Sequence, residues 1–214
     1  MKKQTAILTI EKLAKTKKKK RLFKDFNLSV LSGEWVGIIG ENGSGKTTLA
    51  KIICGLEAVD EGLIFFEGKA QQCFSKKEWL KKVQLVTQYT RHALDPTKTI
   101  KQILFEPINQ FGLAPYNDEE RKIEKILSDC QLPKTILTKY PKKLSGGEYQ
   151  RICVALALLV QPEVLICDEA TANLDKMTEM RILKLLKKKP MSVIFISHDH
   201  TLVKKYCHQF VELT

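Results

Sequence analysis

The stretch from Trp35 to Cys54 reads WVGIIGENGSGKTTLAKIIC, and it decides the expected fold. It opens with an apolar run that ends at Ile39, continues through the glycine-rich GENGSGKT of residues 40–47, and ends in a helical pattern that begins at Thr48. That order of strand, loop and helix satisfies G-x-x-x-x-G-K-S/T, in which glycines let successive backbone amides point at phosphate oxygens. We therefore expect this loop to bind a nucleoside triphosphate.

Two side chains of the loop add a cation and a metal ligand. Lys46 is suited to the β and γ phosphates, and the Thr47 hydroxyl is placed to ligate a magnesium ion. The other nucleotide contacts expected in this loop are Gly40, Glu41, Asn42, Gly43, Ser44, Gly45 and Thr48. An ordinary glycine-rich turn is the alternative, but the strand before the loop and the helix after it favour phosphate binding.

Two further apolar runs end in polar clusters. Val164 to Cys167 runs into DEATANLD, and Val193 to Ile196 runs into SHDH. Unbroken runs of this kind fit parallel strands covered on both faces, and ligands lie at the carboxyl edge of such strands. All three polar clusters should therefore meet at one site. There Asp168 can reach the magnesium ion, and Glu169 faces the space from which water would attack the γ phosphate, which implies hydrolysis.

The remaining patterns complete an α/β protein with a parallel sheet core. Residues 7–10, 26–30 and 63–66 resemble short strands at an edge, whereas residues 100–111, 118–130 and 148–160 are helical by pattern. We expect a single domain over residues 1–214. In it, residues 1–87 and 161–214 form the core with an antiparallel β edge, and residues 88–160 form an inserted α-helical subdomain.

Composition narrows the class of protein. The chain has 214 residues, is 43% hydrophobic and carries a formal charge of +12, and its longest apolar run of nine residues falls short of the roughly 20 that span a membrane. Six cysteines without a C-x-x-C pair indicate reduced thiols in a cytosolic protein. Of 36 cations, 31 are lysines, which favours a solvated surface over a nucleic-acid site. The cluster KTKKKKR at residues 15–21 is either a basic patch or an exposed hairpin tip.

A third motif lies in the helical region. Residues 144–148 read LSGGE, in which Ser145 and Glu148 have the S-x-x-E spacing of a capping box, while Gly146 and Gly147 leave backbone amides unobstructed at the helix start. A well-capped helix without further function is the alternative. The order of phosphate loop, LSGGE and Asp-Glu along one chain favours a functional motif.

This ordered set resembles the ATP-binding cassette family, the ATPase subunits of ABC transporters, over nearly the whole chain. The resemblance implies a P-loop NTPase (RecA-like) core. The matching segments are the Walker A loop at residues 40–47, the Q-loop glutamine at Gln88, the signature at residues 144–148, Walker B at residues 164–169, the D-loop at residues 173–175 and the switch histidine at His198.

The resemblance also implies a mechanism. Two cassettes would sandwich two ATP molecules, each held by the phosphate loop of one and by Ser145, Gly146 and Gly147 of the other, with Asp175 nearby. Glu169 would act as general base and His198 would hold the γ phosphate and the attacking water. Gln88 would join the magnesium shell and report the state of the nucleotide to the helical insertion.

Two departures from the family pattern are visible. An aromatic ring that stacks on adenine is usual in the first hairpin, but residues 13–21 contain none, so that aliphatic lysine stems or cation contacts would have to serve. The D-loop carries Asn173, where serine is commoner.

A finer resemblance, within residues 86–107, is to the dipeptide, oligopeptide and nickel importer branch. The matches are Gln88, Ala93-Leu94-Asp95-Pro96 and Glu106-Pro107, and we expect Pro96 to fix a turn and Pro107 to end the short helix before it. This branch implies a second ATPase chain, membrane permease subunits, an extracytoplasmic substrate-binding protein and a place at the cytoplasmic face of the membrane. Alternatives are another importer or an exporter, and a soluble ABC ATPase acting on ribosomes or nucleic acid, which only the charge favours. A P-loop kinase should lack LSGGE.

Overall fold

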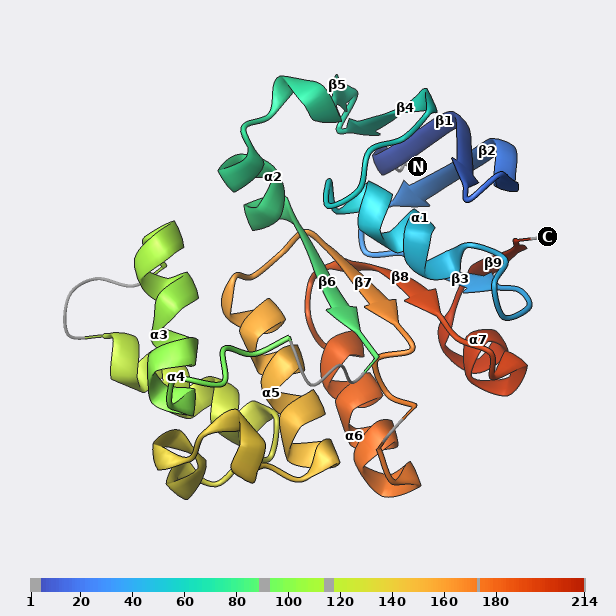
Figure 1. Ribbon diagram of the computed structural model, residues 1–214. Coiled ribbons are helices and arrows are strands. Elements are labelled where there is room, and N and C mark those ends of the chain that lie inside the picture. The colour runs from blue at the N-terminus through green and yellow to red at the C-terminus, as the bar shows by residue number, and fades with distance from the viewer. Residues whose placement is uncertain (1–4, 89–92, 114–117, 173, 214) are drawn as a thin grey trace. The chain divides into compact units, whose positions relative to one another are not determined.

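The computed structural model describes residues 5–88, 93–113, 118–172 and 174–213 (Figure 1). They form two compact units. The first unit contains residues up to 85 together with residues 163–169 and those from 190 onward, and the second unit contains residues 86–162 and 170–189. No helix in the described part of the chain has the length and apolar character that crossing a bilayer requires.

A five-stranded sheet carries the polar clusters. Its strands, in spatial order, are β6 (Val83–Thr87), β7 (Val164–Asp168), β8 (Ser192–Ile196), β3 (Trp35–Ile39) and β9 (Gln209–Glu212). The three predicted strands β3, β7 and β8 are buried along their whole length and pair in parallel. Since Ile196 of β8 is in register with both Ile38 and Asp168, the carboxyl ends of these strands lie at one edge, as the sequence predicted.

A second, antiparallel sheet contains β2 (Lys20–Leu31), β1 (Ala6–Lys17), β4 (Glu61–Phe66) and β5 (Lys69–Ala70), in that spatial order. This is the predicted β edge, with longer strands than expected. Lys17 pairs with Lys20 across a two-residue turn whose Lys18 and Lys19 have φ values of 48° and 65°. Positive φ at both central positions is typical of the tight hairpin turns that match strand twist. The basic cluster is therefore a hairpin tip.

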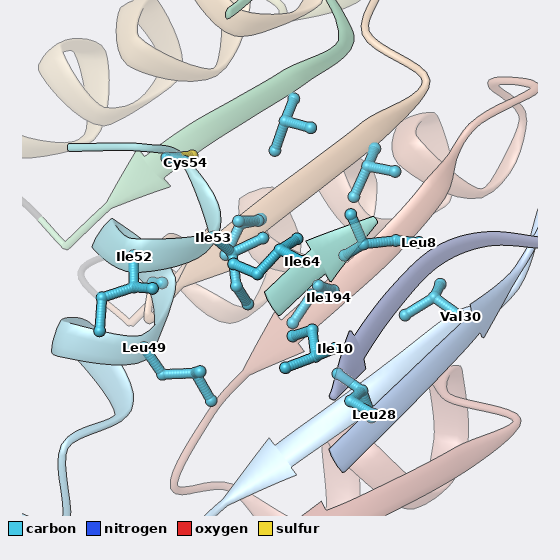
Figure 2. Close-up of a cluster of buried hydrophobic side chains, with 14 of the residues drawn as sticks. Leu8, Ile10, Leu28, Val30, Leu49, Ile52, Ile53, Cys54, Ile64 and Ile194 are labelled. Carbon is cyan, nitrogen blue, oxygen red and sulfur yellow. The ribbon is translucent and has the colours of Figure 1, made fainter. Parts of the chain in front are cut away.

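Helix α1 (Lys46–Ile53) connects the phosphate loop to the core of the first unit. Its Leu49, Ile52 and Ile53 are buried in a cluster that also takes side chains from both sheets (Figure 2). The cluster also contains Ile10 of β1, Ile64 of β4 and Ile194 of β8, which Figure 2 labels. Burying an aliphatic side chain of this size contributes about 1.5–3 kcal/mol, so the packing of α1 holds the loop that precedes it.

The first unit is completed by α2 (Lys76–Lys82) and α7 (His200–Tyr206). The second unit contains α3 (Ile100–Phe111), α4 (Glu119–Asp129), α5 (Gly146–Leu159) and α6 (Lys176–Lys187), with short 3₁₀ turns at Lys134–Thr138 and Pro141–Lys143. The patterns that predicted α3, α4 and α5 are confirmed to within two residues at each end. The sequence patterns did not predict α2, β5, β6, α6, α7 or β9.

Pro107 does not end the helix before it, contrary to expectation. It lies inside α3, which continues to Phe111 and ends at Gly112 in a left-handed conformation. The buried stripe of Ile103, Leu104 and Ile108 spans both sides of the proline. Packing of this stripe therefore outweighs the single backbone hydrogen bond that proline removes.

Residues 170–189 belong to the second unit, although the expected division left them with the core. Two long-range contacts hold them there. Lys189 Nζ lies 2.9 Å from an oxygen of Asp129, and Arg181 donates to the side-chain oxygen of Gln131 over 3.1 Å. Contacts of this kind between distant segments leave no pattern in the local sequence.

Candidate active site

The phosphate loop adopts a backbone that needs glycine at two positions. Gly45 has a φ of 102°, in the region that residues with a Cβ rarely adopt. At Gly40 a Cβ would lie 2.4 Å from the carbonyl oxygen of Leu213, so the close approach of the chain end excludes any side chain. Both glycines of the G-x-x-x-x-G-K-T pattern are thus explained, Gly45 by its backbone conformation and Gly40 by the close approach of Leu213.

Lys46 lies beneath this loop, and only 6% of it is exposed. Its ammonium donates to the carbonyl oxygens of Gly40 at 2.7 Å and Glu41 at 2.8 Å. Thr48, one turn into the same helix, is buried as well, whereas Asn42 is exposed at the loop tip. The lysine therefore holds the loop closed from inside and carries its positive charge to the loop's centre.

Ser44 indicates that the loop is built for a further ligand. Its hydroxyl oxygen is buried and makes no hydrogen bond to any residue that the structure describes. Leaving a buried hydroxyl unpaired costs about 1–3 kcal/mol, so native proteins rarely keep one without a reason. An anion with several acceptor oxygens would satisfy this hydroxyl and the loop amides together. The loop thus fits a phosphate group.

Asp168 stands at the carboxyl end of β7 and is buried. Burial raises the pKa of its carboxyl above the usual range, and the hydrogen bond donated by the Thr47 hydroxyl and the nearby charge of Lys46 oppose that shift. A buried carboxylate beside a hydroxyl is a donor set that suits a hard divalent cation such as Mg²⁺. Thr47 and Asp168, which the sequence proposes as magnesium ligands, are thus in contact.

Glu169 and His198 form the outer part of the site. Glu169 has a φ of 50°, and its backbone amide donates to the carbonyl oxygen of Ile196 at 3.0 Å, which ties the ends of β7 and β8 together. Its carboxylate oxygen Oε1 lies 3.4 Å from Nδ1 of His198, a side chain that is 66% exposed. An acid–base pair therefore faces solvent next to the buried Asp168.

The signature residues begin helix α5 in the second unit. Ser145 caps the helix in a full capping box: its hydroxyl accepts from the amide of Glu148 at 3.2 Å, and a Glu148 oxygen accepts from its amide at 2.8 Å. A Cβ at Gly146 would meet nothing within 4 Å, and one at Gly147 would only touch Leu174. The described fold therefore does not require glycine at these two positions, and the start of α5 is open to approach.

Two other predicted residues also lie in the second unit. Asp175 caps α6 by accepting from the amide of Thr178 at 3.0 Å, a hydrogen bond that lowers the pKa of its carboxyl. Gln88 follows β6 and is exposed. Asn173 lies outside the described residues. The structure thus brings Lys46, Thr47, Asp168, Glu169 and His198 together in the first unit, and it holds Gln88, Ser145, Gly146, Gly147 and Asp175 in the second.

Sequence reasoning missed one residue at the phosphate loop. The ammonium of Lys20, in the first hairpin, lies 3.4 Å from the carbonyl oxygen of Gly43. Beside it, Leu22 approaches Gly45 so closely that a Cβ there would lie 3.1 Å away. Only the lysine cluster could have signalled this contact, because the position of the hairpin over the loop is set by tertiary packing.

These features define a P-loop ATPase of the cassette type. The family model described as ABC transporter matches residues 23–172 of this chain. The chain belongs to the ABC transporter family, and it is an ATPase subunit.

Curated relatives and solved structures agree. The nickel import ATP-binding protein NikE of Escherichia coli strain K12 is 34% identical over 88% of this chain and 73% of the relative, and the same figures hold for NikE of Shigella dysenteriae serotype 1. A dimeric ATP-binding cassette in a post-hydrolysis state with ADP and Pi superposes with a TM-score of 0.85 at 25% identity, over 97% of this chain and 94% of that one. Clostridium perfringens cbiO1, part of the ABC transporter complex cbiONQ, gives 0.81 at 27% identity, over 98% and 85%.

Proposed function

We propose that this chain is the ATP-hydrolysing subunit of an importer for nickel or peptides, in which ATP binding and hydrolysis between two cassettes drive substrate through separate membrane subunits. The 34% identity to nickel import ATP-binding proteins supports this substrate class. The observation that carries the hydrolytic part is the pairing of Glu169 with His198 beside the phosphate loop. Import by another branch, or export, is the second candidate.

The first step belongs to the phosphate loop. The amides of residues 40–47 and the positive end of α1 attract the triphosphate, and the Ser44 hydroxyl gains its missing partner. Lys46 now donates to two carbonyl oxygens of its own loop. Phosphate oxygens carry more negative charge than carbonyls and therefore compete for its ammonium, which draws the β and γ phosphates to the loop's centre.

Thr47 and Asp168 would hold Mg²⁺, and Gln88 completes the set of proposed ligands. Once bound, this ion neutralises charge on the β and γ phosphates. Burial disfavours the charged form of the Asp168 carboxyl in the protein alone, and a bound cation would favour that form. The position of Asp168 therefore suits a carboxylate with a bound cation better than a carboxylate without one.

Glu169 is the proposed general base, and His198 is its positioning partner and γ-phosphate contact. The imidazole is within 3.4 Å of the carboxylate and mostly exposed, so it can turn toward a phosphate while it keeps the carboxylate in place. A carboxylate held at the strand end can accept a proton from the attacking water. The backbone bond from Glu169 to β8 holds the base at this edge.

The signature residues would cover the nucleotide of a companion cassette. Gly146 and Gly147 are open to approach, and Ser145 begins a helix whose free amides suit a γ phosphate. Asp175 would lie at the same interface. A similar cassette is dimeric with ADP and Pi, which supports a paired arrangement. The partner is a second ABC ATPase subunit, which we expect to be a different chain.

Lys20 offers a contact for the nucleotide where the family has an aromatic ring. Its ammonium already lies at the rim of the phosphate loop, and its aliphatic stem presents an apolar surface. Residues 13–21 provide no ring for stacking. Adenine would then rest on aliphatic and cationic groups.

The remaining partners follow from the importer proposal. They are transmembrane permease subunits and an extracytoplasmic substrate-binding protein, with this chain at the cytoplasmic face of the membrane. Nucleic acid is not an expected partner. Copurification of the chain with hydrophobic membrane subunits supports the proposal, whereas copurification with RNA would favour the ribosome-acting alternative.

Glu169→Gln tests the proposed function most directly. The amide keeps the shape of the side chain but cannot take a proton, so ATP binding should persist while turnover falls by about 100-fold or more. Glu163→Gln is the matched control, because Glu163 lies in the same unit and pairs with Lys82 on the surface. ATP turnover and ATP-dependent association with the companion ATPase subunit are measured for both variants. Wild-type turnover in Glu169→Gln would reject the assignment of the base.

A further inference from the structure

Two neighbouring residues of the signature helix hold the two ends of the segment that contains Gln88. Gln150 donates from Nε2 to the carbonyl oxygen of Thr87 at 3.0 Å, immediately before Gln88. Tyr149 accepts at its hydroxyl from the backbone amide of Leu94 at 2.9 Å, six residues further on. Both side chains are almost fully buried, at 1% and 2% exposure. Thr87 and Leu94, on either side of Gln88, are therefore both bonded to one turn of α5.

The same turn begins at the signature. The amide of Tyr149 donates to the carbonyl oxygen of Ser145 at 2.9 Å, so the capping residue and the residues that hold the segment share one helical turn. The capping box fixes the start of this turn. Arg151 stiffens it further by donating to the carbonyl oxygens of Gly147 and Gln131. A displacement at either end of the segment must therefore move the helix start or break a buried hydrogen bond.

The side-chain amide of Gln150 is only half satisfied, which is a second indication that it takes part in a conformational change. Its side-chain oxygen Oε1 is buried and has no hydrogen-bond partner among the described residues. A buried amide with one half satisfied and one half not is costly in a fixed structure. The Oε1 atom of Gln150 can gain a hydrogen bond in a second arrangement of the surrounding chain. Such a gain favours a residue that switches between two states over one that only supports a fixed structure.

We propose that Tyr149 and Gln150 are positioning residues that clamp the Gln88 segment to the signature helix, so that a nucleotide-dependent shift of Gln88 moves Ser145, Gly146 and Gly147 with it. This inference rests on the proposed function, because it assigns a link between two parts of that machinery. The clamp does not touch the nucleotide. It acts on catalysis through the placement of the signature that faces the companion cassette.

Two conservative variants open the clamp at one end each. Tyr149→Phe removes only the hydroxyl that holds Leu94, and Gln150→Met keeps the length of the side chain but removes the donor to Thr87. Matched controls are Tyr140→Phe, at a half-exposed tyrosine of the same unit, and Gln84→Met, which removes a similar amide-to-carbonyl hydrogen bond, to Leu80, on the strand that ends at Thr87.

Kinetics and amide exchange are measured on the complex of this chain with its companion ATPase subunit, at a temperature where every variant is folded. We expect each clamp variant to keep its ATP dissociation constant within about twofold of wild type, while kcat falls by about ten- to a hundredfold, since misplacement of a catalytic part by an ångström costs that much. Mg·ATP should change the exchange of the amides at 145–148 in wild type and in both controls. That response should be lost in both clamp variants.

Two results would overturn the clamp. One is a wild-type kcat together with a wild-type exchange response in both variants. The other is an equal loss of ATP affinity and kcat, which would mean that the residues serve only the stability of the unit. Lys46→Ala is measured alongside to separate failure of the clamp from failure of the proposed function. If Lys46→Ala binds and hydrolyses ATP like wild type, the proposed function fails, whatever the results for the clamp variants.

Discussion

At the scale of single residues, Lys46 is already positioned to bind phosphate. Its ammonium donates hydrogen bonds to two carbonyl oxygens of its own loop. Lys46→Ala should lower ATP affinity at least about tenfold, because a hydrogen bond to a charged group contributes about 1.5–3 kcal/mol. Calorimetric titration with ATP is the measurement. Lys51→Ala, in the last turn of the same helix, is the control, and unchanged affinity in Lys46→Ala would contradict the prediction.

Asp168 gives a prediction about pH. Burial raises the pKa of its carboxyl from the ordinary 3.8, so folding favours the neutral form. The stability that this provides is complete below the unfolded-state pKa and is lost as pH rises through the folded-state value. Asp168→Asn should therefore raise the melting temperature of the chain without nucleotide or metal at pH 7, and the gain should shrink as pH falls toward the ordinary carboxyl pKa of 3.8.

Thermal unfolding between pH 4 and pH 8 checks this expectation. Asp175→Asn is the control with the opposite sign, because hydrogen bonds from Thr178 lower the pKa of Asp175 and its charged form is the favoured one. That variant should lose stability at pH 7. A melting temperature of Asp168→Asn below wild type at every pH would show that the carboxylate contributes more through its contacts than burial costs it.

At the scale of elements, the helices α2, α3 and α5 share one capping device, the capping box. Ser145 and Glu148 cap α5, and Ser75 and Glu78 cap α2 with the same reciprocal hydrogen bonds. Ser145→Ala and Ser75→Ala should each lower the free energy of unfolding by about 1 kcal/mol, the usual cost of losing such a cap. Chemical denaturation measures both losses.

The two variants should differ in activity. If the start of α5 covers a nucleotide in a companion cassette, Ser145→Ala reduces ATP turnover beyond its effect on stability, and Ser75→Ala leaves turnover at the wild-type level. Equal turnover in the two variants would mean that the serine of the signature is a helix cap and nothing more.

At the scale of the whole molecule, α1 links the phosphate loop to the core of the first unit. Leu49 is fully buried in the cluster that takes side chains from both sheets. Leu49→Ala should lower the free energy of unfolding by about 2–5 kcal/mol. Leu56→Ala, at a position that is 55% exposed, should stay within about 0.5 kcal/mol of wild type. Denaturant titration of both variants measures the contrast, and a loss below 1 kcal/mol for Leu49→Ala would contradict the packing described.

The sequence predicts an element of this structure when the element depends on a local residue pattern, and fails when it depends on tertiary packing. Strands such as Val164–Asp168 were predictable because burial on both faces demands an unbroken apolar run. Strand Val83–Thr87 was not, because its half-buried pattern is short and mixed. Pro107 misled, because the packing of the residues around it is not visible in the local sequence.

The sequence by itself indicated the family and proposed Lys46, Thr47, Asp168, Glu169 and His198 as site residues, because each belongs to a short motif whose chemistry is local. Only the tertiary structure decided that Lys20 reaches Gly43, that residues 170–189 pack with the second unit, and that Tyr149 and Gln150 hold the Gln88 segment at both ends. The physical reason is that these contacts join residues from about 20 to more than 60 positions apart, and such pairs are set by packing rather than by any local spacing of residue types.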